Sequence, residues 1–152
     1  MKTNSEGLAL IMDSEGFRAD WYLCPAGKPT IGFGHTGPLP EGFNAPLSQD
    51  QAERLLRLDL AAFEKAVSEL VKVQLTANRF SALVSFVYNV GVQSFRKSAL
   101  LRRLNALDYA LAAEEFKRWV KARGKPLPGL VKRRLAEREL FLKEDTDEFF
   151  PA

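Results

Sequence analysis

Residues 15–36 read EGFRADWYLCPAGKPTIGFGHT and combine the clearest strand signals of the chain with several chemically useful side chains. Aromatic and β-branched residues flank a turn that contains proline and glycine, which predicts a hairpin within residues 21–34. Glu15 closes the apolar segment that comes before, and Cys24 and Thr30 stand on or beside the expected strands. We therefore expect a carboxyl, a thiol and a hydroxyl around one cleft.

Helical periodicity dominates the chain on both sides of this stretch. Ser48 and Gln51 form a capping box before a long apolar repeat, which extends to about Val73 and would measure roughly 40 Å. The segment that Thr76 caps and Gly91 ends is apolar on most sides, so we expect it at the buried centre. The expected helices are 4–15, with Asn4 or Ser5 as N-cap and Gly16 at its end, 48–73, 76–91, 94–105, 108–121 and 129–143.

The order of these elements predicts an α+β architecture. A small N-terminal β-sheet lobe, about residues 16–47, is expected to join a larger helical lobe through the long helix. Glycines and prolines predict loops at 37–47 and 123–128, and the acidic tail 144–152 is expected to fray. The whole chain, 1–152, has the usual size of one domain, here in two lobes.

Composition and charge exclude several classes of function. One cysteine and one histidine are too few soft ligands for a zinc site, so we expect neither a metal nor a cofactor. The net charge is +3, but the basic residues are interleaved with 19 acidic ones, which argues against nucleic acid as a partner. No apolar run approaches the roughly 20 residues that cross a bilayer, and 7–12 is too short for a secretory signal. We expect a chain without stable membrane insertion that starts in the cytoplasm.

A series of short motifs runs along nearly the whole chain in a specific order. The spacing Glu15-x8-Cys24-x5-Thr30 is followed by GFGHT at 32–36, QAERLL at 51–56, FVYNVG at 86–91, RWV at 118–120, and GL at 129–130 with Arg133, Arg134 and Glu137. This series resembles the phage-type lysozymes, or endolysins, which are glycoside hydrolases. The fold of that family, two lobes bridged by a long helix with a cleft between them, agrees with the element order above.

The resemblance implies roles for the three residues of the first motif. Glycosidic bonds break through an oxocarbenium-like transition state, so an acid protonates the leaving oxygen while a second group serves the anomeric carbon. Glu15 is implied as the acid, and Thr30 as a residue that holds the catalytic water. Many family members have aspartate at the position of Cys24. A thiol there can orient or deprotonate water, or act as a nucleophile if its pKa is lowered, and a small buried hydrophobic residue is the alternative.

Other residues of the expected cleft follow from the same resemblance. An arginine, Arg133 or Arg134, is implied near the acid Glu15, and His35 is implied in structural hydrogen bonding rather than in proton transfer. For each saccharide-binding candidate, a role in the core or in a helix cap stays an alternative. The candidates are Thr36, Tyr88, Asn89 and Ser98.

The function implied by the resemblance is a muramidase. It would hydrolyse the β-1,4 bond between N-acetylmuramic acid and N-acetylglucosamine in bacterial peptidoglycan and cause lysis of the host cell. We expect a monomer that binds the glycan strand and stays in the host cytoplasm until a holin-dependent release. A lytic transglycosylase would use the same acid without a water-positioning group, against which Thr30 and Cys24 argue. A non-hydrolytic glycan-binding module is disfavoured by Glu15 and Thr30, although the cysteine leaves it some room.

Overall fold

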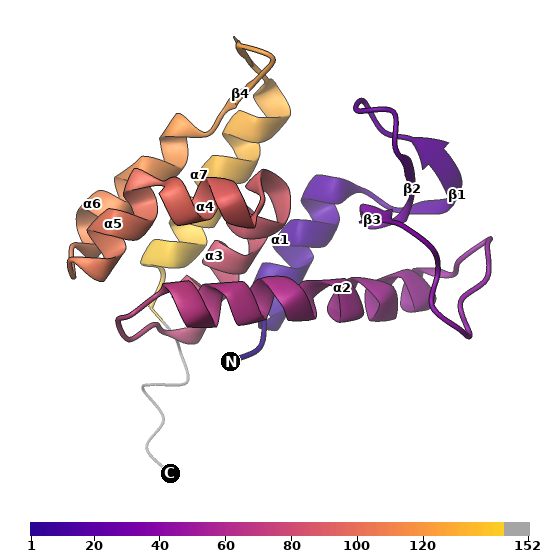
Figure 1. Cartoon of the computed structure of the whole chain (residues 1–152), viewed down its shortest axis with the longest axis horizontal. Coiled ribbons are helices and arrows are strands. Elements are labelled where there is room, and N and C mark those ends of the chain that lie inside the picture. The colour runs from indigo at the N-terminus through magenta and orange to yellow at the C-terminus, as the bar shows by residue number, and fades with distance from the viewer. Residues whose placement is uncertain (145–152) are drawn as a thin grey trace.

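A helix of 22 residues, α2 (Gln49–Leu70), connects a small sheet to a larger group of helices in the computed structural model (Figure 1). The structure describes residues 1–144, so the acidic tail lies outside the described residues except for Glu144. At the usual rise, α2 measures about 33 Å. Ser48 and Gln51 form the predicted capping box, whereas the helix ends at Leu70 because Val71 has an extended backbone. The predicted α+β architecture is confirmed.

The sheet contains three antiparallel strands in the order β1-β2-β3. Strands β1 (Arg18–Leu23) and β2 (Pro29–Gly32) form the predicted hairpin, with Tyr22 opposite Thr30. Strand β3 (His35–Thr36) pairs with β2 and places Thr36 opposite Thr30. This third strand was not predicted, because two residues are too few to show an alternating pattern.

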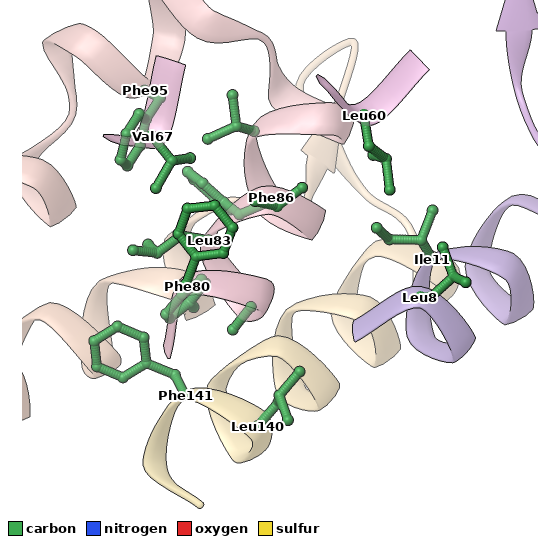
Figure 2. Close-up of a cluster of buried hydrophobic side chains, with 14 of the residues drawn as sticks. Leu8, Ile11, Leu60, Val67, Phe80, Leu83, Phe86, Phe95, Leu140 and Phe141 are labelled. Atoms are coloured by element: carbon green, nitrogen blue, oxygen red, sulfur yellow. The ribbon is translucent and has the colours of Figure 1, made fainter. Parts of the chain in front are cut away.

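The core of the helical region is built around α3 (Ala77–Val90), in which nine of 14 residues are buried. This helix packs against α1 (Ser5–Glu15), α2 and α7 (Pro128–Leu142). The ring of Phe86 meets three other aromatic rings edge-on, with centroid distances of 5.4 to 6.3 Å. Figure 2 shows how α1, α2, α4 and α7 contribute side chains to the same cluster. The prediction that the 76–91 segment forms the buried centre is confirmed.

The segment 94–105 is two helices rather than the one predicted. Helix α4 (Val92–Lys97) ends at Ser98, whose extended backbone (φ −74°, ψ 150°) interrupts the helical path before α5 (Ala99–Asn105). Serine side chains bond readily to nearby backbone groups, which favours a cap over a helix interior. The apolar stripe continues across this break, and periodicity alone therefore did not predict it.

The segment 108–121 is shorter as a helix than predicted, and a hairpin follows it. Helix α6 (Tyr109–Glu115) passes into the 3-10 turn η1 (Phe116–Arg118), and β4 (Lys121–Ala122) pairs with β5 (Lys125–Pro126) where a loop was expected. Arg123 and Gly124 have positive φ angles of 53° and 79°, which is the backbone that a two-residue hairpin turn requires. No helix within residues 1–144 is both long and apolar enough to cross a membrane.

Candidate active site

Glu15 is the last residue of α1, and its side chain is only partly buried, at 21% exposure. Gly16 follows with φ 76°, so the chain turns away and the carboxylate is left at the helix end. Nη1 of Arg133, on α7, donates to Oε2 of Glu15 at 2.6 Å. Arg133 is therefore the arginine that reaches the acid, while Arg134 points to Glu137 and lies over the ring of Phe86.

Gly34, in the turn between β2 and β3, brings backbone against the same carboxyl group. A Cβ atom at this position would lie 2.8 Å from Oε1 of Glu15 and 3.3 Å from the Tyr88 hydroxyl, and the φ of Gly34 is 85°. A larger residue here would adopt a strained backbone conformation and would push the Glu15 carboxyl away from its present position, so glycine is favoured. The GFGHT motif contained this signal, but its functional meaning was not predicted.

Tyr88 ties this turn to α3. Its hydroxyl donates to the carbonyl of Phe33 at 2.9 Å, and its ring meets Phe63 edge-on at 5.2 Å. Burial, and then the nearby charge of Glu15, raises the pKa of Tyr88 well above its usual value. The phenol is therefore a neutral hydrogen-bond donor that holds the Gly34 turn close to Glu15.

Cys24 and Thr30 meet at the turn that joins β1 to β2. The Cys24 N–H donates to the Lys28 carbonyl at 3.0 Å, and the Gly27 N–H donates to the Cys24 carbonyl at 2.8 Å. The Thr30 hydroxyl donates to the same Lys28 carbonyl at 2.9 Å. The backbone N–H of Lys28 holds the pKa of the half-buried Cys24 thiol below its usual range, and further hydrogen bonds from the backbone of this turn help to outweigh the opposing effect of burial. The turn thus favours a thiolate.

Alkylation of Cys24 should accordingly become fast at a lower pH than alkylation of an unstructured cysteine, whose pKa is about 8.5. The thiolate is the reactive form, so a lowered pKa shifts the midpoint of the rate profile down. The rate of iodoacetamide modification can be followed by mass spectrometry from mildly acidic to alkaline pH, for the folded chain and for the chain in urea. The chain has a single cysteine, so the readout is unambiguous. Equal midpoints in the two states would contradict this prediction.

Comparison with known proteins agrees with the geometry. Residues 12–137 match the family model described as phage lysozyme. The chain belongs to the phage lysozyme family. It is 45% identical over 145 residues to an endolysin of Acyrthosiphon pisum secondary endosymbiont phage 1, which covers 93% of this chain and 98% of the relative.

Two solved structures share the fold. The muramidase domain of SpmX from Asticaccaulis excentricus has a TM-score of 0.85 at 38% identity, and a mutant of P22 lysozyme has a TM-score of 0.84 at 37% identity. Each comparison covers 94% of this chain and 99% of the other. The expected lysozyme-like fold, with a sheet lobe, a helical lobe and a joining helix, is confirmed. So is the expected enzyme class, an endolysin of the lysozyme type that cleaves peptidoglycan.

The saccharide-binding candidates of this phage lysozyme family member lie in different surroundings. Thr36 is exposed and helps line a hollow of about 480 Å³ together with Trp21 and Pro38. Asn89 is exposed and follows Tyr88 on α3. Ser98 is buried, and its hydroxyl donates to the Phe95 carbonyl at 2.7 Å and accepts the Leu101 N–H at 3.1 Å. These bonds are those of a helix cap, the alternative that the sequence left open, and saccharide contacts stay predictions for all four candidates.

His35 fastens β3 to α2. Its Nδ1 lies 2.8 Å from Oδ2 of Asp59, and its Nε2 lies 3.2 Å from the Pro38 carbonyl. Burial raises the pKa of Asp59, and the contact with His35 opposes that rise. Asp59 was not predicted as a partner, although a carboxylate within the apolar repeat of α2 was the available signal.

One further contact joins the helical region to the Cys24 turn. Nη2 of Arg123, in the β4–β5 turn, donates to the carbonyl of Pro25 at 3.4 Å. A surface groove of about 1080 Å³ between α1 and α7 is lined by Arg133 but by none of Glu15, Cys24 and Thr30. Within residues 1–144, no group of three or more histidine, cysteine, aspartate or glutamate side chains is placed to hold a metal ion.

Proposed function

We propose that this chain hydrolyses the β-1,4 bond between N-acetylmuramic acid and N-acetylglucosamine, with Glu15 as the general acid. The observation that supports this most directly is the position of the Glu15 carboxyl between Arg133 and Gly34. Arg133 occupies Oε2, so Oε1 is the oxygen that can carry a transferable proton. In the reaction, Oε1 gives this proton to the leaving glycosidic oxygen as the bond to the anomeric carbon breaks.

In the proposed reaction, Cys24 and Thr30 position and deprotonate the water that attacks the anomeric carbon. The hydroxyl of Thr30 donates to Lys28, so its oxygen lone pairs are available to accept a hydrogen from water. The thiolate of Cys24 takes the second proton of that water as the water oxygen bonds to the anomeric carbon. At the end of this step, the proton from water is bound to the Cys24 sulfur, and the proton from Glu15 is bound to the oxygen of the leaving sugar. This direct displacement inverts the anomeric configuration.

Analysis of the digestion products tests the proposed reaction. Purified peptidoglycan incubated with the chain should yield fragments with reducing muramic-acid ends, separable by chromatography and identified by mass spectrometry. A lytic transglycosylase would give anhydro ends instead, and a glycan-binding module would release no fragments. The proposal fails if either of these results is obtained with active, folded protein.

We also propose that the chain acts as a monomer on the glycan strand and reaches the wall from the host cytoplasm through a holin-dependent release. Membership of a family with endolysins supports this route. No metal or cofactor takes part in the proposed reaction, because a carboxyl, a thiol and a hydroxyl provide the required proton transfers.

A further inference from the structure

A buried set of charged and polar side chains lies behind Glu15, and the reaction proposed above makes no use of it. Its centre is Glu137 on α7, whose side chain is completely buried. Oε2 of Glu137 accepts from the Ser85 hydroxyl at 2.6 Å, from Nη2 of Arg134 at 3.2 Å and from Nε of Arg133 at 3.3 Å. Oε1 lies 2.7 Å from Nε of Arg134.

Arg133 is the link between this set and the acid. Its side chain is 4% exposed, and each of its three guanidinium nitrogens has a partner. Nε donates to Glu137, Nη2 donates to the Ser85 carbonyl at 3.1 Å, and Nη1 donates to Glu15. A guanidinium group is a rigid plane, so holding Nε and Nη2 also determines where Nη1 lies.

The charges of the set balance across Glu15, Arg133, Glu137 and Arg134. Burial raises the pKa of the Glu137 carboxyl, and the contacts with the two arginines and with Ser85 oppose that rise. A neutral residue at 137 would leave Arg133 and Arg134 side by side, and Glu15 would be the one carboxylate within residues 1–144 that still contacts Arg133. Two neighbouring buried cations repel each other, so Arg133 would be free to leave its present position.

We propose that Glu137 is a positioning residue for the catalytic acid: it holds Arg133, and Arg133 holds Glu15 in the orientation from which the proton is transferred. This inference rests on the proposed role of Glu15 as the acid. Small displacements of a reacting group lower catalytic rates strongly, because the group must meet the bond at a defined distance and angle. The expected signature is a loss in kcat rather than in KM.

The chain offers a matched control for Glu137. Glu115 is also a buried glutamate, at 5% exposure, and it pairs with Arg103 and Arg118 at 2.9 Å and 2.8 Å, but it has no contact with Arg133. Glu137→Gln should lower kcat on soluble peptidoglycan strands about five-fold with KM changed less than about two-fold. Glu115→Gln should leave kcat within about two-fold of the unmodified chain even where its Tm falls by a similar amount. Equal kcat values for the two variants would overturn the proposal.

A second pair of variants keeps the test informative if Glu137→Gln does not fold. Ser85 and Ser81 are both fully buried serines on α3, but only Ser85 touches Glu137, whereas the Ser81 hydroxyl accepts the Asn4 N–H. Ser85→Ala should lower kcat about two- to three-fold, and Ser81→Ala should not lower it. Equal effects of both alanines would count against the proposal.

A double variant tests whether Glu137 acts through Arg133. In an Arg133→Lys background, Glu137→Gln should cause no further fall in kcat, because the group through which it acts is already lost. Additive losses would show that Glu137 acts independently of Arg133 and would overturn the proposal. Glu15→Gln separates this result from a failure of the proposed function. If Glu15→Gln stays active, the acid itself is misassigned; if it is inactive while Glu137→Gln behaves like Glu115→Gln, only the positioning role is wrong.

Discussion

Glu15→Gln should reduce hydrolysis by about 10² to 10⁴-fold while leaving the fold intact, because general acid catalysis contributes a factor of that size. Glutamine has nearly the same volume as glutamate, and its side-chain oxygen can still accept from Nη1 of Arg133. Its amide cannot deliver a proton to the leaving oxygen. The variant should therefore bind peptidoglycan but not release fragments from it.

Turbidity of a cell-wall suspension and the appearance of reducing ends are suitable measurements for this variant. Asp13→Asn is a matched control, since Asp13 is an exposed acid on the same helix. That control should clear the suspension at the rate of the unmodified chain. Clearing by Glu15→Gln at the same rate would show that the acid is another residue and would end the proposed mechanism.

Those parts of the fold that depend on local hydrogen bonds could be predicted from sequence. Ser48 accepts the Gln51 N–H and Thr76 accepts the Arg79 N–H, so each cap joins residues a few positions apart, and both helices begin at the expected caps. The break at Ser98 and the β4–β5 hairpin could not be predicted in the same way. The break at Ser98 gives no signal in the sequence because the apolar stripe continues across it. The β4–β5 hairpin depends on a positive φ at Arg123, and arginine rarely adopts that conformation.

The limits were different for the site. Spacing and resemblance identified Glu15, Cys24 and Thr30 as candidate site residues. They did not determine which of two adjacent arginines contacts Glu15, because that depends on how α7 is rotated about its axis. Consecutive residues on a helix point about 100° apart, so Arg133 and Arg134 face different neighbours. The burial of Glu137 follows from the same rotation, because its partners lie three and four residues earlier on the same helix.

Cys24→Ala should lower the rate of lysis by about ten-fold or more, a loss of roughly 1.4 kcal/mol or more of transition-state stabilisation, while Cys24→Asp should stay active. Aspartate can also orient water and stabilise developing positive charge at the anomeric carbon, and alanine can do neither. The lowered pKa of the Cys24 thiol is consistent with a proton acceptor, since the same turn of backbone N–H groups would stabilise a carboxylate. Lysis rates of the three chains give the comparison directly.

Chemical modification of the unmodified chain provides an independent measurement of the same role. An alkylating reagent should abolish lysis, because the single thiol would then carry a bulky adduct beside Thr30. A bound muropeptide should slow the modification if the thiol faces the substrate. The Cys24→Asp variant is the control, since a reagent that also inactivates it must act at another residue. An alanine variant as active as the unmodified chain, with a thiol that saccharide does not protect, would mean that Cys24 only packs in the turn and that Glu15 and Thr30 work without it.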